Sequence, residues 1–294
     1  MRILPVALTA LALLAAACSP EPDYSGQTRT VAAHWRNSPE RVSWTDGLVL
    51  LQHLTLESEG RRPKWAHFSS GARVWKLEAD LPSDAPAPAE LRWRDGTTLT
   101  VPLLSPAAAY TALTGPSRRR DGRCPAAGCR PLRVTKVTRG ETTAYSSRGE
   151  VRLPTWDYTV DGLTEPYRRI AVDPSAMGAP PRRFGNGLPA PVSAYEFRSA
   201  TELRLRYQHG ACDTTHGASA YETPEVVVVI VDVRDDDLPD GMGCPLIGRE
   251  DQIYVTLQAP LGRRVVLDAS TGLPVMPRGD NPYIGPLTFD ARES

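Results

Sequence analysis

Short stretches in which apolar and polar residues alternate make up much of this chain, and turn-forming dipeptides separate them. The clearest stretch surrounds Asp95-Gly96, where apolar residues occupy positions 91, 93, 99 and 101. Two-residue Asp-Gly loops favour tight hairpins because both central residues of a type I′ turn need a positive φ angle. The pattern therefore predicts a hairpin with one buried and one solvated face. Asp46-Gly47 and Asp161-Gly162 also separate apolar runs and predict hairpins of the same kind.

Residues 225–233 form the most apolar segment beyond the N-terminus, with six valines and one isoleucine. β-branched side chains fit a pleated sheet better than a helix. The segment therefore predicts a central strand that is covered on both faces. Residues 253–267 predict a further hairpin around Pro260-Leu261-Gly262, where proline and glycine stand at positions typical of a turn.

Residues 106–114 carry the only convincing helix signal. Ser105 can cap the first free amides, Pro106 suits the first helical position, and Gly115 can end the helix in a left-handed conformation. A helix of this length is not stable alone in water. We therefore expect it to pack on a sheet.

These elements predict a mainly β protein of antiparallel, sandwich-like sheets in two lobes, with one short helix at 106–114. A single elaborated sandwich would also fit a chain of 294 residues. In the two-lobe arrangement the segments are a lipoprotein signal peptide (1–18), a flexible tether (19–40), an N-terminal β lobe with the helix (41–117), an Arg-rich Cys loop (118–131), a C-terminal β lobe (132–275) and a Pro-rich tail (276–294).

Residues 1–18 have the pattern of a signal peptide: Arg2 precedes an apolar run that ends in small residues. The run of about 14 residues is shorter than the ~20 helical residues that span a bilayer. Its ending, Ala15-Ala16-Ala17-Cys18, resembles the lipobox of bacterial lipoproteins. This resemblance implies that Cys18 is lipidated, becomes the mature N-terminus and holds the protein on the outer face of the cell membrane.

The charges of the chain balance, with 34 basic and 34 acidic residues. This balance does not point to nucleic acid as a partner. The expected partners are the membrane, through Cys18, and a protein or polymer of the cell envelope. The arginines of residues 118–130 are interpreted as a solvated linker, with contact to anionic headgroups or wall polymers as the alternative.

Four cysteines remain besides Cys18, namely Cys124, Cys129, Cys212 and Cys244. An even number outside the cytoplasm predicts two disulfides, for which three connectivities exist. We favour Cys124 with Cys129 and Cys212 with Cys244, because each pair is nearest in sequence and lies among turn-forming residues.

Two groups of residues could hold a metal, although we expect no metal and no cofactor. One is a zinc set of His209, Cys212, His216 and Cys244, which oxidation of the cysteines would remove. The other is a calcium loop of Asp235, Asp236, Asp237, Asp240 and Gly241, in which Pro239 breaks the usual ligand spacing. We interpret the second group as a solvated loop beside a disulfide.

No catalytic residue is singled out. The chain lacks a Gly-x-Ser-x-Gly elbow, and no carboxylate pair stands out among the 34 acidic residues. Of the tryptophans, Trp65 and Trp75 have the weakest strand pattern and are the candidates for ligand contact.

Two stretches resemble segments of uncharacterised lipoproteins of high-GC Gram-positive, actinobacterial type. They are Ser146-Ser147-Arg148-Gly149 through Trp156, and Ala259-Pro260-Leu261-Gly262 through Asp268 and Gly272. The resemblance implies localisation and a shared fold and no catalytic residue. The sequence therefore predicts a lipid-anchored, non-enzymatic binding module of the envelope. A hydrolase with dispersed carboxylates and a purely structural lipoprotein are the alternatives.

Overall fold

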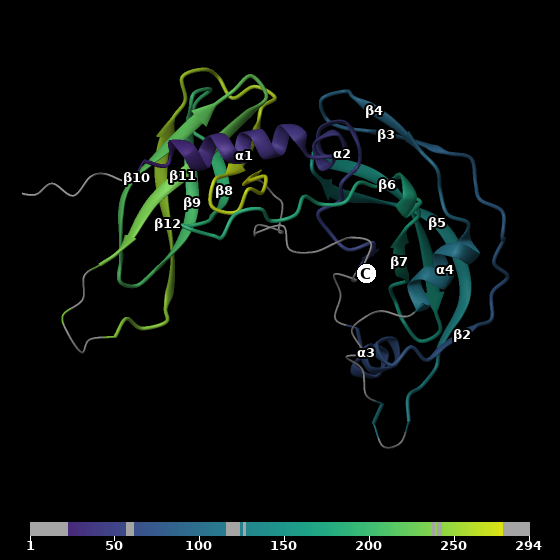
Figure 1. The fold of residues 1–294 in the computed structure, drawn as a ribbon. Coiled ribbons are helices and arrows are strands. Elements are labelled where there is room, and N and C mark those ends of the chain that lie inside the picture. The colour runs from purple at the N-terminus through teal and green to yellow at the C-terminus, as the bar shows by residue number, and fades with distance from the viewer. Residues whose placement is uncertain are drawn as a thin grey trace, which may run out of the picture.

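The computed structural model describes residues 23–56, 62–115, 124–125, 128–236, 239 and 243–278. It has two β lobes, joined by helices and an extended segment (Figure 1). The mainly β fold with antiparallel sheets is confirmed. The predicted signal peptide with Cys18, and most of the Arg-rich loop and the tail, lie outside the described residues.

The first lobe is built on a five-stranded sheet in the order β1-β7-β6-β5-β2. Its centre is the long hairpin of β5 (Leu132–Ser146) and β6 (Gly149–Val160). The other strands are β7 (Tyr167–Ile170), β1 (Thr55–Leu56) and β2 (Trp75–Leu77), of which β2 runs parallel to β5. β6 and β7 pair antiparallel on either side of Asp161-Gly162, as predicted, but the pairing begins at Tyr158 and Tyr167, so the connection is longer than the predicted two-residue turn.

The hairpin predicted around Asp95-Gly96 is confirmed as β3 (Ala89–Arg92) and β4 (Thr98–Val101). The expected type I′ turn does not form, because only Gly96 has a positive φ, of 83°, and the turn is closed by a hydrogen bond from the Trp93 amide to the Thr97 carbonyl. The predicted helix is α4 (Pro106–Thr114), and the Ser105 side chain accepts a hydrogen bond from the Ala108 amide. Gly115 has a φ of −65°, so the predicted left-handed end is wrong. A further helix, α3 (Lys64–Gly71), packs beside this sheet.

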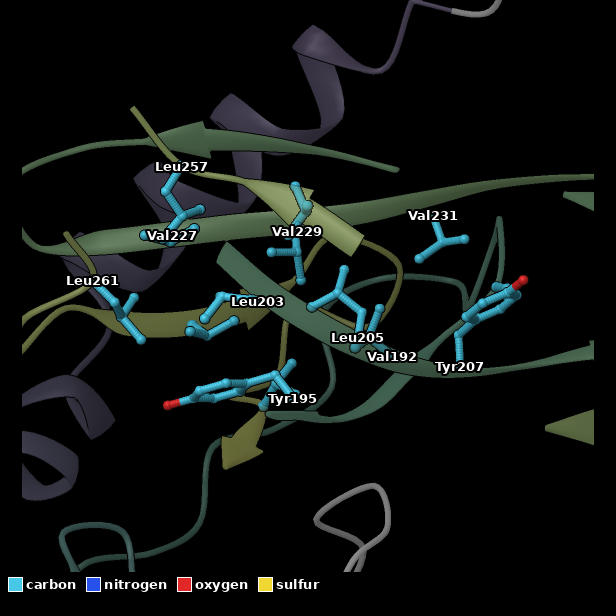
Figure 2. Close-up of a cluster of buried hydrophobic side chains, with 14 residues drawn as sticks. Val192, Tyr195, Leu203, Leu205, Tyr207, Val227, Val229, Val231, Leu257 and Leu261 are labelled. Atoms are coloured by element: carbon cyan, nitrogen blue, oxygen red, sulfur yellow. The ribbon is translucent and has the colours of Figure 1, made fainter. Parts of the chain in front are cut away.

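The second lobe is a sandwich of two sheets, β10-β11-β13 and β12-β9-β8-β14. Its strands are β8 (Val192–Phe197), β9 (Glu202–Gly210), β10 (Asp213–Glu222), β11 (Val226–Asp235), β12 (Gly248–Thr256), β13 (Val265–Asp268) and β14 (Met276–Pro277). Figure 2 shows the apolar cluster between the sheets, in which Val227, Val229 and Val231 of β11 meet Leu203 and Leu205 of β9. The central strand predicted at 225–233 is confirmed, because β11 pairs on both sides.

The predicted tether is wrong for residues 25–37, which form helix α1 (Ser25–Asn37). Thr28, Val31, Ala32 and Trp35 are buried on one side of α1, and the last three pack in the cluster that holds Val226, Val228 and Ile230 of β11. Burial of such an apolar stripe stabilises a helix by more free energy than the ordering of its backbone costs. This part of the chain is therefore a structural element of the second lobe.

The hairpin predicted at Asp46-Gly47 is also wrong. Residues up to Asp46 form α2 (Glu40–Asp46), and Gly47 has a φ of −93° at the end of that helix. Residues 48–51 then run extended: Leu48 and Leu50 enter the core of the first lobe, whereas Val49 and Leu51 enter the cluster around α1. Successive side chains point to opposite sides, as in a strand, and each side is buried in a different apolar core.

The predicted boundary at 118–131 divides the chain in the wrong place. Strands β5, β6 and β7 belong to the same sheet as β1 and β2, whereas the sheets of the second lobe begin with β8. The lobes are separated instead by the irregular, proline-rich residues 171–191, which include a short 3₁₀ turn, Pro174–Ala176. The boundary was misplaced because β2 pairs with β5, which lies more than fifty residues later in the chain. Local composition cannot predict pairing over such a distance.

Two other local predictions are corrected. The hairpin expected at 253–267 does not form, because β12 pairs with β9 while β13 runs parallel to β11. The start of the predicted tail, Met276–Pro277, is strand β14 and pairs with β8. The favoured disulfides, Cys124 with Cys129 and Cys212 with Cys244, are both present.

Candidate functional site

A cleft of about 650 Å³ lies between the two lobes. One wall comes from the end of α2, the β3–β4 turn and the β5–β6 turn, which contribute Asp46, Asp95 and Arg148. The other wall comes from the second lobe and includes Tyr195 of β8 and Arg263 in the loop before β13. The volume is within the range of small-molecule sites, and groups of both charges line it.

The first wall is fixed by the two-residue turn between β5 and β6. The Ser147 hydroxyl donates to the Trp44 carbonyl at 2.8 Å, and the Ser147 amide donates to the Val49 carbonyl at 2.9 Å. The Ser146 hydroxyl accepts from Nε1 of the buried Trp93 at 2.9 Å. The turn is thus tied to α2 on one side and to the β3–β4 hairpin on the other.

Arg148 connects the three parts of this wall. Its guanidinium lies 3.7 Å above the centre of the Trp93 ring, a cation–π contact. It also donates to the Asp46 carbonyl at 3.0 Å and to the Thr97 hydroxyl. Because most of its donors are already used, Arg148 serves to position the wall and supplies a fixed positive charge.

Asp95 is exposed at the tip of the β3–β4 turn. Hydrogen bonds from the Thr97 hydroxyl and amide lower its pKa, and the positive charges of Arg148 and Arg263 lower it further. The carboxyl group is therefore ionised at neutral pH. The contribution of Arg263 means that charges on opposite walls are near enough to interact across the cleft.

The second wall depends on an ion pair between Arg264 and Glu222, whose N···O distance is 2.7 Å. Burial opposes ionisation of Glu222, but hydrogen bonds from the Gln258 amide, from Arg264 and from the Ala259 amide lower its pKa overall. Arg264 also donates to the carbonyls of Ala259, Pro260 and Leu261. The loop that carries Arg263 is therefore held from inside.

Two hydrogen-bond donors of the second wall have no partner in the described part of the chain. Arg263 is exposed and makes no hydrogen bond or ion pair there. Tyr195 packs its ring against the sandwich core, and Figure 2 shows its hydroxyl directed away from the valines. Burial raises the pKa of Tyr195 to about 12, so the hydroxyl stays protonated and can donate.

The cleft therefore offers two carboxylates beside the fixed charge of Arg148 on one wall and, among the described residues, unpaired donors on the other. A ligand that carries a cation and an anion would satisfy both walls at once. A hydrolase that works with a pair of carboxyl groups needs one of them to be protonated near neutral pH. Among the described residues only Asp268 has a carboxyl pKa that is raised overall, by burial, and its Oδ2 accepts hydrogen bonds from the Ser270 and Thr271 hydroxyls, each at 2.7 Å.

The zinc set of His209, Cys212, His216 and Cys244 is not assembled, because Cys212 and Cys244 are joined in a disulfide. His209 lies 2.8 Å from the Gly210 carbonyl through Nδ1. Of the calcium loop, Asp237, Asp240 and Gly241 lie outside the described residues, and Asp235 and Asp236 are exposed at the end of β11. In the described part of the chain, no three metal-binding side chains gather.

Trp65 and Trp75, the predicted ligand contacts, are half-buried against the core of the first lobe. The Trp75 ring meets the edge of Tyr167 at a centroid distance of 4.7 Å, and Arg130 covers Trp65 at 4.4 Å. Their contact with a ligand stays a prediction. The other arginines of the predicted cluster, at 118–123, lie outside the described residues.

The sequence reasoning missed Asp46, Asp95, Tyr195 and Arg263 as members of one site. One signal points to the cleft: both stretches that carry the lipoprotein resemblance contribute to it, the first through Ser147-Arg148-Gly149 and the second through residues 262–266. These stretches lie more than a hundred residues apart in the chain. Only the tertiary fold brings them to opposite walls.

No protein-family model, curated protein or solved structure matches this chain significantly. None of the helices in the residues that the structure describes is long and apolar enough to cross a membrane.

Proposed function

We propose that this is a lipid-anchored extracytoplasmic binding protein that holds a small zwitterionic ligand, such as a short peptide, in the cleft between its lobes. The observation that carries the proposal is the set of charges in the cleft: Asp46 and Asp95 line one wall, Arg263 and Tyr195 line the other, and Arg263 is near enough to lower the pKa of Asp95. Ligands of the cell envelope that contain free amino and carboxyl groups fit this arrangement.

The anchor is supported by the signal peptide and by Cys18 at its end. The two disulfides agree with folding in an oxidising compartment. A lipid at Cys18 would keep the cleft close to the membrane surface, where wall fragments and secreted peptides are concentrated.

The rigid parts of the cleft support binding. The Arg264–Glu222 pair fixes one wall and the Arg148–Trp93 contact fixes the other. Because these groups are already ordered, a ligand loses little free energy in immobilising them. We therefore expect the affinity for the ligand to depend most on Arg263, Tyr195 and Asp95, which line the cleft.

The test is calorimetric titration of the full-length protein in detergent with trialanine, whose termini are free, and with its N-acetyl, C-amide form. We expect heat only with trialanine. Arg263→Gln and Asp95→Asn should each weaken binding about tenfold, because each removes one charge-assisted hydrogen bond. Arg152→Gln is the matched control, since Arg152 pairs with Glu141 on the exposed β5–β6 hairpin.

Equal binding of the blocked peptide would contradict the proposal that the site recognises a zwitterion. Loss of binding in Arg152→Gln would contradict the assignment of the site to the cleft. The anchor is tested separately. Mass spectrometry of the N-terminal peptide from membranes should show an acylated Cys18, and an unmodified Cys18 would refute it.

A further inference from the structure

Three large apolar side chains are exposed together at one end of the second lobe. Leu246 is fully exposed, Leu188 is 65% exposed and Ile247 is 58% exposed. They border one open hollow, whose lining also includes Pro189 and Pro245. We call Leu188, Leu246 and Ile247 the apolar patch. Clustered exposed apolar residues of this kind mark contact sites.

The patch is held in place by the structure beneath it. The Cys212–Cys244 disulfide ties the segment before Leu246 to the β9–β10 connection. A bridge between Ala190 and Val231 fixes the segment after Leu188 to β11. The three exposed side chains therefore lie on segments that are fixed to the sandwich.

The described chain begins at this same end of the lobe. Tyr24 donates through its hydroxyl to Asp232 near the end of β11, at 2.8 Å. Gln27, in the first turns of α1, donates to the Leu188 carbonyl at 2.9 Å. The start of α1 is thus in direct contact with a residue of the apolar patch.

Only four residues, 19–22, lie between Cys18 and Asp23. Even in a fully extended chain, the five steps from Cys18 to Asp23 span about 17 Å. A lipid on Cys18 would therefore hold this end of the second lobe against the bilayer. This step depends on the lipid anchor of the proposed function.

We propose that the apolar patch is a membrane-contact surface, which inserts Leu188, Leu246 and Ile247 into the boundary between headgroups and acyl chains and orients the lobes on the membrane. The neighbouring Asp235 and Asp236 are exposed acidic residues. Contact is therefore apolar, and anionic lipid does not strengthen it. The occupant is a lipid surface, because the anchor brings one to the patch and the exposed side chains of the patch are apolar.

The test uses the full-length protein, reconstituted in phosphatidylcholine vesicles that contain a phospholipid with a diazirine on its acyl chain. After irradiation, mass spectrometry maps the lipid adducts to residues. We expect adducts at Leu246 and Ile247, and their loss in the variant that carries Leu246→Ser and Ile247→Ser. Replacing part of the phosphatidylcholine with phosphatidylglycerol should not raise the yield.

Phe197 provides a matched control. It is 57% exposed and belongs to the same lobe. It pairs with Leu203 near the start of β9, whereas Gly210 at the other end of β9 pairs with Gly248, next to Ile247. Phe197 therefore lies at the far end of the sandwich and should acquire few adducts.

Equal yields at Phe197 and Leu246, or no adducts at Leu246, would overturn the proposal, and the second result would indicate a protein partner for the patch. The same spectra report the mass of the Cys18 peptide. An unmodified Cys18 refutes the anchor on its own: adducts at Leu246 would then still support membrane contact, and their absence would refute both.

Discussion

Arg264 and Glu222 form an ion pair in which the side chains are only 11% and 10% exposed, respectively. The pair holds the loop between β12 and β13, because Glu222 accepts a hydrogen bond from the Gln258 amide and Arg264 donates to the Ala259 carbonyl. The first prediction concerns this pair. Breaking a buried ion pair leaves an uncompensated charge, so Arg264→Met should destabilise the protein by about 3 kcal/mol. Chemical denaturation measures this loss.

The double variant Arg264→Met/Glu222→Leu is the control, because it removes both charges. It should recover most of the lost stability. If the double variant were as unstable as the single one, the hydrogen bonds of Arg264 to the loop carbonyls, rather than the ion pair, would account for the effect.

Trp35 of α1 carries the second prediction. It is 3% exposed and meets Trp44 of α2 edge-on, at a centroid distance of 6.3 Å. Trp35→Ala should cost about 4 kcal/mol, because a large cavity opens where α1 joins the second lobe. Differential scanning calorimetry would measure the loss. The neighbouring Arg36 is exposed, so Arg36→Ala should change stability by less than about 0.5 kcal/mol.

The disulfides give the third prediction. Cys212 and Cys244 are 32 residues apart, and Cys124 and Cys129 only 5. In the chain-entropy description, the longer loop stabilises by about 4 kcal/mol and the shorter by about 2 kcal/mol. The variant Cys212→Ser/Cys244→Ser should therefore melt well below Cys124→Ser/Cys129→Ser. The reverse order would mean that the melting temperatures are set by packing lost around the substituted cysteines and not by the entropy of the unfolded chain.

The sequence was informative wherever a pattern is local. Asp95-Gly96 predicted its hairpin, Ser105 its helix cap, and the valines of β11 a buried strand. Local patterns also contained a helix that was missed: Thr28, Val31, Ala32 and Trp35 repeat at helical spacing. The composition of residues 19–26 concealed it, because their prolines, serines and glycine suggested a tether.

Other features depend on contacts that no local pattern reports. Asp46-Gly47 has the dipeptide of a hairpin, but Trp44 packs beside Trp35 and the segment ends a helix instead. The parallel pairing of β13 with β11 prevents the hairpin at Pro260. For the same reason the cleft could not be predicted, since Asp95 and Arg263 approach only when the lobes are joined.

Glu78 provides the last prediction, a pH dependence. Hydrogen bonds from Arg133 and Lys76 lower the pKa of its carboxyl group to about 2. A carboxyl whose pKa is lower in the folded state stabilises the fold above its unfolded pKa, about 4.3, and this contribution is lost as the pH falls toward 2. Carboxyl ¹³C NMR should therefore show Glu78 titrating near pH 2. In Arg133→Gln its pKa should rise toward 4.3, and an unchanged value would assign the shift to Lys76 alone.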